Sequence, residues 1–380
     1  MLNHGNMDGM TTAIDVVEPK TVPASFAPRG PLSAALLHTL SHEPDAILDN
    51  SAVLDTSELL ASAHTAVGSS PSVVRDEDIQ LSLFLLYGLH YGSLTGVSDD
   101  WEWQTGLIDV RHVLERAFER ELREVVPVPE LPSATRSAVA RALAELTSAE
   151  GGPSLSRYVA KKASDEHLHE FLIQRSIYTL READPHSWAI PRLTGRPKAA
   201  LVEIQSDEYG AGRAASMHST IFATTMRLMG LDTTYGHYVD AVPAITLASL
   251  NTMSLFGLNR RLRGAIVGHL AAFEMTSSIP NMMYGNGFRR LGYGADVTAY
   301  FDEHVAADAV HEQIAANDLA GSLAEDEPSL LRDIFFGASA CLVVDGWASA
   351  HMLEAWTAGV SSLRHPAGEF AEENGIHDGK

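Results

Sequence analysis

The stretch YFDEHVAADAVHEQIA, residues 300–315, decides which fold the chain is expected to adopt. Its alanine content and apolar spacing are typical of a helix. In an α-helix, positions i, i+4 and i+7 turn through about 400° and 700°, so His304, Asp308 and His311 share one narrow face. Such a face is either a solvated acidic surface or a row of metal ligands whose desolvation a bound ion offsets. Because this spacing arises by chance in about one sequence in twenty of this composition, other residues must decide between the two.

Composition limits the classes of protein to which the chain can belong. It has 380 residues, 45% of them hydrophobic, which is enough for a sizeable core. A net charge of −22 without a basic cluster argues against nucleic acid and anionic membranes as partners. No segment stays apolar over the roughly 18 to 20 residues of a membrane helix, and the single cysteine, Cys341, cannot form an internal disulfide. We therefore expect a cytoplasmic protein that binds neither membranes nor nucleic acids.

The order of sequence patterns predicts an all-α chain in four parts. Residues 1–30 lack periodicity and are expected to be a disordered leader, and residues 366–380 a flexible tail. Residues 31–150 carry amphipathic helical patterns and form a predicted N-terminal helical extension. Residues 151–365 carry further helices in which acids and histidines lie among apolar neighbours. No strand alternation and no repeat of fixed period is evident, which favours a helical bundle.

A second pair of candidate ligands lies within one long helical pattern that ends at Gly230. Glu208 and His218 are ten residues apart, so on a straight helix they would be separated by about 15 Å and could not hold the same ion. They could serve two ions, or the helix could bend at Gly210 or Gly212. The alternative is that Glu208 and its acidic neighbours are surface residues.

Two further glutamates complete the candidate set. Glu274 lies in an apolar run, where a carboxylate is rarely buried without a partner. If the helix ending near residue 183 and the one beginning near residue 197 form an antiparallel hairpin, Glu170 lies level with Glu208. Glu182 is nearer the loop and ranks second for that place.

Taken together, these residues favour a site for two metal ions. Carboxylates that bridge ions, with one or more histidines per ion, are typical of helical bundles that hold iron or manganese pairs. Zinc usually takes four ligands, and a haem site would not require so many acids and lacks a Cys-x-x-Cys-His motif here. The candidate metal ligands are Glu170, Glu208, His218, Glu274, His304, Asp308 and His311.

Three segments, EIQSDEYGAGRAASMH, RRLRGAIVGHLAAFEMTSS and EHVAADAVH, carry a resemblance to a known family. Over roughly residues 155–360 the chain resembles the iron-containing redox enzymes with a haem-oxygenase-like fold, the non-haem di-metal oxidases and oxygenases. The resemblance implies a haem-oxygenase-like helical bundle that holds two iron ions, Fe(II) or Fe(III), one of them weakly, with O2 as co-substrate. It also implies that His304, Asp308 and His311 are ligands on one core helix, Glu208 and His218 on a second and Glu170 on a first, and that Glu274 precedes the last ligand helix.

One position departs from a common pattern of di-iron bundles. Many read Glu-x2-His on a ligand helix, whereas the residue three before His218 is Ala215. Glu208 would then supply that carboxylate from further away.

The resemblance implies an oxidoreductase, and three functions stay open. The first is oxygenation or oxidation of a small amine or amino acid, such as N-oxygenation, in specialised metabolism. The second is oxidative C–C cleavage or desaturation of an aliphatic acid by the same centre, and the third is a degenerate helical protein that only binds a ligand or partner. No catalytic residue beyond the metal ligands can be named.

The expected partners are a small-molecule substrate, an external electron donor and a second copy of the chain in a homodimer. A substrate carboxylate would find a guanidinium among four arginines, which could equally form surface salt bridges. These are Arg213, Arg260, Arg261 and Arg263.

Overall fold

The computed structural model describes residues 26–44, 56–148 and 154–364, and within α15 the side chains of residues 306–310 are outside the description. These described residues contain helices and no strand, so the predicted all-α fold is confirmed for them. The first half of the helices comprises α1 (Pro31–Leu40), α3 (Thr56–Ser69), α4 (Glu77–Gly88), α5 (Thr105–Val125), α6 (Arg136–Thr147), α7 (Leu155–Lys161), α8 (Asp165–Thr179) and α9 (Asp184–Ser187). The second half comprises α10 (Gly195–Glu208), α11 (His218–Leu228), α12 (Ala244–Leu258), α13 (Arg263–Met275), α14 (Ser278–Arg290), α15 (Ala295–Gln313), α16 (Ser322–Asp326) and α17 (Leu331–Thr357).

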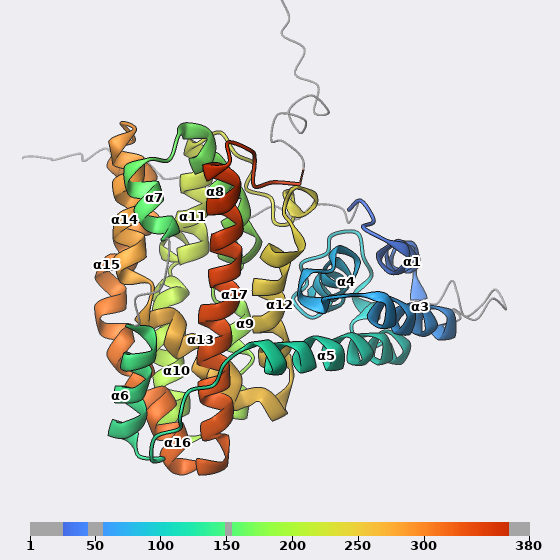
Figure 1. The fold of residues 1–380 in the computed structure, drawn as a ribbon, viewed down its shortest axis with the longest axis horizontal. Coiled ribbons are helices and arrows are strands. Elements are labelled where there is room, and N and C mark those ends of the chain that lie inside the picture. The colour runs from blue at the N-terminus through green and yellow to red at the C-terminus, as the bar shows by residue number, and fades with distance from the viewer. Residues whose placement is uncertain (1–25, 45–55, 149–153, 365–380) are drawn as a thin grey trace, which may run out of the picture.

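Helices α7 to α17 form an upright bundle, and α1, α3, α4 and α5 project from one side of it (Figure 1). Helix α4 joins the two parts because it packs against α12 and is apolar on all faces, as expected of a helix covered on every side. At this contact Asn251 donates hydrogen bonds from its side chain to the Gln80 carbonyl at 2.9 Å and to the Gln80 amide oxygen at 2.8 Å. The amide nitrogen of Asn251 and both oxygens of Gln80 are thereby satisfied.

Helix α6 lies on a different part of the bundle from α1, α3, α4 and α5, although all five fall within the predicted extension (Figure 1). It packs against the π-helical segment Ile314–Gly321, which continues α15. Arg136, at the start of α6, pairs with Asp318. A Cβ at Gly321 would lie only 2.8 Å from the Arg136 carbonyl oxygen. The predicted extension is therefore divided between two places on the bundle.

The chain is held to the bundle from residue 26 onward. Residues 26–30 belong to the predicted leader, the rest of which lies outside the described residues, as does the predicted tail. Arg29 donates to the Val242 carbonyl at 3.0 Å and pairs with Glu77 at 2.6 Å, and the Ala27 amide donates to Asp240 at 3.0 Å. This last stretch of the predicted leader is therefore ordered, because its backbone and its arginine find fixed acceptors.

No helix in the described part of the chain is both long enough and apolar enough to cross a bilayer.

The closest helix crossing in the bundle joins α13 and α17 through glycines. A Cβ at Gly268 would lie 1.8 Å from the Ile334 carbonyl oxygen, and one at Gly337 would lie 1.9 Å from the Ala265 carbonyl oxygen. The backbones can therefore meet only where there is no side chain. This crossing fixes α13, which carries Glu274, against the longest helix of the bundle.

We expect Gly337→Ala to destabilise the protein by about 1–3 kcal/mol or more, because its methyl group has no space at the crossing. Gly346→Ala, on the same helix, is the matched control: a Cβ there meets no atom within 4 Å. That change should stabilise the fold by up to about 1 kcal/mol through helix propensity. Urea unfolding of both variants measures the difference, and equal stabilities would contradict the crossing.

Candidate metal centre

The long helix predicted around Glu208 is broken into two. Helix α10 ends at Glu208, two short 3-10 turns follow at Gly210–Gly212 and Ala214–Ser216, and α11 begins at His218. Gly210 adopts a φ of +65°, and a Cβ there would lie 2.6 Å from the Met217 nitrogen. The expectation of a continuous helix was wrong, and the chain takes the bend that the glycines offered as the alternative.

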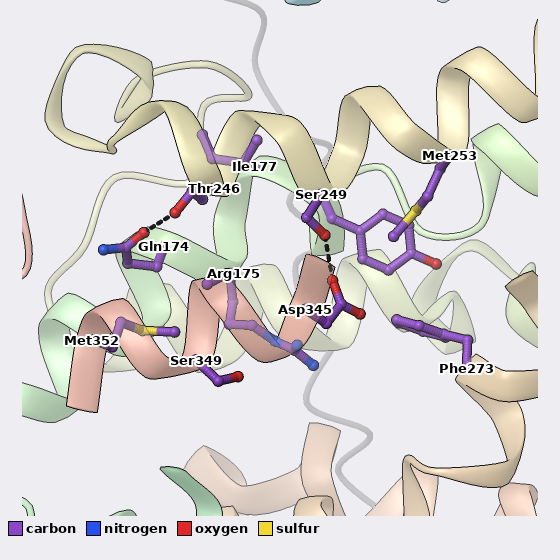
Figure 2. Close-up of a pocket in the computed structure, with 12 residues that line it drawn as sticks. Gln174, Arg175, Ile177, Thr246, Ser249, Met253, Phe273, Asp345, Ser349 and Met352 are labelled. Atoms are coloured by element: carbon purple, nitrogen blue, oxygen red, sulfur yellow. Dashed lines mark hydrogen bonds between the residues drawn. The ribbon is translucent and has the colours of Figure 1, made fainter. Parts of the chain in front are cut away.

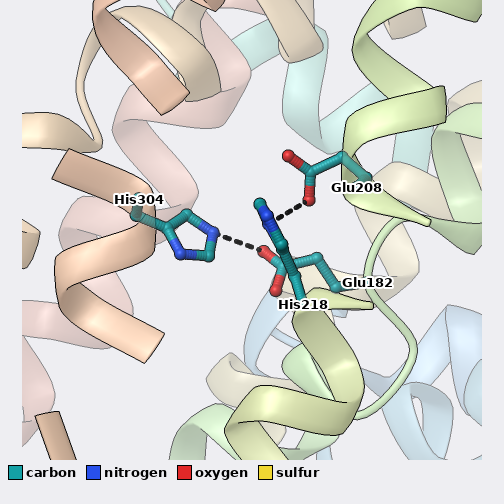
Figure 3. Close-up of side chains that lie close together, drawn as sticks. All are labelled: Glu182, Glu208, His218 and His304. Atoms are coloured by element: carbon teal, nitrogen blue, oxygen red, sulfur yellow. Dashed lines mark ion pairs between the residues drawn. The ribbon is translucent and has the colours of Figure 1, made fainter. Parts of the chain in front are cut away.

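The break brings together a first group of buried ligand-type side chains, Glu182, Glu208, His218 and His304 (Figure 3). One potential ligand atom from each lies within 4.8 Å of the others. His218 Nδ1 is 2.8 Å from Glu208 Oε2, and His304 Nε2 is 3.6 Å from Glu182 Oε1. Two carboxylates and two imidazoles therefore converge on one point.

A second group shares Glu208 with the first. Its members, Glu208, Glu274 and His311, also offer ligand atoms within 4.8 Å of one another and are buried. His311 Nδ1 lies 3.4 Å from Glu274 Oε2 and 3.9 Å from Glu208 Oε1. One oxygen of Glu208 thus faces His218 and the other faces His311, so this carboxylate belongs to both groups.

Neighbouring groups orient these side chains. His304 donates from Nδ1 to the Tyr300 carbonyl at 2.9 Å, so Nε2 is the nitrogen that faces Glu182. The Tyr300 hydroxyl donates to Glu182 Oε2 at 2.9 Å. His311 Nε2 lies 3.1 Å from Asp207 Oδ2, so Nδ1 is the nitrogen that faces the second group. Such outer contacts are what metal-binding histidines usually have.

The site's unsatisfied atoms fit bound cations. The Nδ1 atoms of His218 and His311 are buried and make no aligned hydrogen bond within the described part of the chain, although carboxylate oxygens lie near both. Three buried carboxylates, Glu182, Glu208 and Glu274, stand among them. Buried carboxylates beside poorly aligned imidazole nitrogens form a donor set that a bound cation would satisfy.

Without metal, the acids and histidines of the site compensate one another. Burial would raise the pKa of Glu182, but His304 and His218 beside it hold that pKa below its usual range. Burial would lower the pKa of His311, yet Glu274, Asp207 and Glu208 raise it to about 9. In His218 the effect of burial is likewise exceeded by Glu208, which raises the pKa. The metal-free centre therefore holds protons where cations would bind.

A cavity of about 10 Å³ lies between the two groups, with Glu182, Glu208, Glu274 and His304 in its wall. This is about the space of one water molecule or ion. The other lining residues include Tyr178, Leu270 and Phe273, which limit access of water.

The structure brings together five of the seven residues that the sequence proposed as ligands: Glu208, His218, Glu274, His304 and His311. The side chain of Asp308 lies outside the described residues. Glu170 is not in either group. Its Oε2 accepts hydrogen bonds from the Ser362 amide at 2.8 Å and from Trp356 Nε1 at 2.7 Å, so it ties α8 to the segment after α17.

Glu182, the second choice from the sequence, takes the place expected for Glu170. Residues 180–194 are not a tight turn but carry α9 and a 3-10 turn, Ile190–Arg192, before α10 begins. Helix α10 then runs back, so that its last turn lies beside the start of α9: Gln205 donates to the Ala183 carbonyl at 2.9 Å, and Tyr209 donates to Asp184 at 2.8 Å. The prediction that Glu170 lies level with Glu208 assumed a tight hairpin. It was wrong because the connection between the two helices is longer than that.

Among the candidate arginines, Arg261 pairs with Glu119 and Arg263 pairs with Glu327. Arg213 and Arg260 are exposed. The salt-bridge alternative therefore holds for Arg261 and Arg263.

Comparison with known proteins agrees with this geometry. A family model described as "iron-containing redox enzyme" matches residues 169–346, a range that contains every member of both ligand groups. Over residues 169–346 the chain is therefore similar to iron-containing redox enzymes. The resemblance seen in the sequence is thereby confirmed.

The chain also has a curated relative. Over 156 residues the chain is 28% identical to a nitrosourea synthase of Streptomyces achromogenes subsp. streptozoticus, a match that covers 41% of this chain. The chain spans about a third of the length of that relative, 33% of it.

Behind the centre lies a buried pair of histidines that belongs to neither ligand group. His186 on α9 and His269 on α13 approach to 3.2 Å between Nε2 and Nδ1, and both are fully buried. Burial lowers the pKa of His269 to about 3 and that of His186 well below its usual value. His269 is therefore a neutral core histidine.

The choice between Glu182 and Glu170 is testable by metal content. After anaerobic loading with Fe(II) and desalting, Glu182→Ala should hold about one iron or less per chain, where the parent should hold about two. Glu170→Ala is the matched control and should keep the parent's iron content, although the loss of its hydrogen bonds should lower stability by about 1–3 kcal/mol. Iron is measured by mass spectrometry of the folded protein. The reverse pattern of iron loss would restore Glu170 as the ligand.

The histidine pair predicts a pH dependence of stability. His269 has a folded pKa of about 3, below the unfolded value near 6.5, so between these values the unfolded chain binds the extra proton. Stability should fall as pH drops below about 6.5, with His269 contributing about 1.4 kcal/mol per pH unit. His269→Gln should reduce this slope, measured by urea unfolding between pH 6.5 and 4.5. A slope equal to that of the parent would contradict the assignment.

Proposed function

We propose that the chain is a non-haem di-iron oxidoreductase that uses O2 to oxidise a small amine or amino acid. The observation that carries the proposal is the position of Glu208, whose two oxygens face histidines of two separate ligand groups. A shared carboxylate between mixed nitrogen and oxygen ligands is typical of paired iron sites in helical bundles. A relative named nitrosourea synthase supports a nitrogen-containing substrate.

Two ferrous ions bound in this centre would supply electrons for the reduction of O2. The residues of the chain provide the setting. Glu208 would hold both ions at a fixed separation, and Tyr300 keeps the Glu182 carboxylate turned inward. Tyr178 and Phe273 limit water at the open side of the small cavity, which protects reactive species from side reactions.

The two alternative functions have less support. Oxidation of a long aliphatic acid would call for a long apolar pocket, whereas the cavity next to the centre measures about 60 Å³ and contains charged side chains. A degenerate centre would lack some of its metal-ligating side chains, yet the six such side chains in the two groups are all buried and converge.

The test is iron loading followed by O2 consumption. Full-length protein loaded anaerobically with Fe(II) should hold about two irons per chain, and an oxygen electrode should record uptake that an amine or amino acid accelerates. Glu208→Ala removes the shared carboxylate and should lose both irons and at least 100-fold in the rate of uptake. Glu203→Ala, an exposed acid on the same helix, is the control and should behave like the parent.

Absence of iron after loading would overturn the proposal. Iron binding without any O2 uptake, across a panel of amines, amino acids and aliphatic acids, would favour the degenerate binder instead. Uptake accelerated only by aliphatic acids would favour the second alternative.

A further inference from the structure

A second cavity, of about 60 Å³, lies between α8, α12, α13 and α17 (Figure 2). On the scale by which one water molecule takes about 10–15 Å³, it holds about four to six non-hydrogen atoms. That is the size of an amino-acid head group. Its lining residues include Arg175, Ile177, Ser249, Met253, Phe273 and Asp345.

The cavity adjoins the metal centre. Tyr178 and Phe273 line both this cavity and the small one among the ligands Glu182, Glu208 and Glu274. The two cavities therefore share these side chains as part of their walls. A substrate whose head is held here can therefore direct its remaining atoms toward the metals.

Arg175 presents to the cavity a guanidinium group that has no hydrogen bond and no ion pair within 4.0 Å in the described part of the chain. Its charge is felt by Asp345 and Glu182 at longer range, and it lies over the Phe171 ring at 5.8 Å from the ring centre. It is half-buried, so water satisfies it only in part. Guanidinium groups bind carboxylates through paired hydrogen bonds. A substrate carboxylate would therefore accept the hydrogen bonds for which Arg175 has no acceptor in the described part of the chain.

Asp345 presents the opposite charge to the same cavity. Its Oδ1 accepts a hydrogen bond from Ser249 at 2.6 Å, and Oδ2 has only the weak Cys341 thiol at 3.9 Å. Figure 2 labels Asp345 and Arg175 in the cavity wall with no bond drawn between them, and no ion pair joins them within 4.0 Å. The two charges attract each other without direct contact, and each can still form a hydrogen bond to a further partner.

We propose that this cavity binds the head group of an α-amino acid, with Arg175 holding the carboxylate and Asp345, positioned by Ser249, holding the ammonium group. The inference rests on the proposed function and names its substrate class. A simple amine would leave Arg175 without an acceptor for its hydrogen bonds, and an aliphatic acid would leave Asp345 Oδ2 facing the weak Cys341 thiol. Each missing hydrogen-bond partner is costly in a site that water reaches poorly. The two charges together therefore select a zwitterionic amino acid over a simple amine or a simple acid.

Calorimetry on the full-length, iron-loaded protein without O2 tests the proposal. The probes are the twenty common L-amino acids and, for each one that binds, its decarboxylated amine and its deaminated acid. We expect at least one amino acid to bind and both of its analogues to bind at least tenfold more weakly. Tighter binding of an amine or an acid than of its parent amino acid would overturn the proposal, as would no binding by any amino acid.

Two variants separate the roles of the charges. Arg175→Met should weaken binding of the amino acid and of the acid at least tenfold while leaving the amine unchanged. Asp345→Asn should weaken the amino acid and the amine while leaving the acid unchanged. Ser349→Ala, an uncharged change in the same wall, is the control for general disturbance of the cavity. Thermal unfolding of each variant verifies that it is folded.

Measuring the iron content distinguishes a failure of the head-group assignment from a failure of the di-iron function. If the parent holds iron and consumes O2 but neither charged variant changes amino-acid binding, the head-group assignment fails and the di-iron function stands. If amino acids bind with the expected dependence on both charges while no iron is held, the function fails and the cavity assignment stands.

Discussion

The structure depends on one buried carboxylate, that of Glu208. Its two oxygens face His218 and His311, which come from different helices, so the site can form only if the chain turns sharply between Glu208 and His218. The positive φ of Gly210 and the close approach of Met217 to it provide that turn. A straight helix would have put about 15 Å between the two side chains and left the glutamate buried without compensation.

This constraint explains what the sequence could and could not predict. Helical periodicity placed His304 and His311 on one face, and the rarity of buried acids singled out Glu274; both inferences depend on local pattern alone. The choice between Glu170 and Glu182 depended on the path of residues 180–194, which no local pattern reveals. Likewise, Ala215 is no obstacle, because the break lets Glu208 reach His218 without a Glu-x2-His spacing.

Charged residues in the second cavity illustrate a further limit of sequence reasoning. Arg175 lies in a helix rich in polar residues, where an arginine is usually at the surface. Asp345 lies in the apolar α17, where an acid attracts attention, yet its partner across the cavity is 170 positions away in the chain. The sequence pointed instead to Arg261 and Arg263, whose carboxylate partners are protein side chains. Only tertiary packing distinguishes an arginine with a partner from one without.

The crossing of α13 and α17 links the two sites mechanically. From Gly268, α13 continues for six residues to Glu274 at the metal centre, and from Gly337, α17 continues for eight residues to Asp345 at the second cavity. These stretches rise about 9 Å and 12 Å along their axes from a common contact. Because the glycines allow the backbones to touch, neither helix can slide without steric clash. The separation between a held head group and the metal ligands is therefore set by backbone packing rather than by flexible side chains, which is what positioning of a substrate for reaction requires.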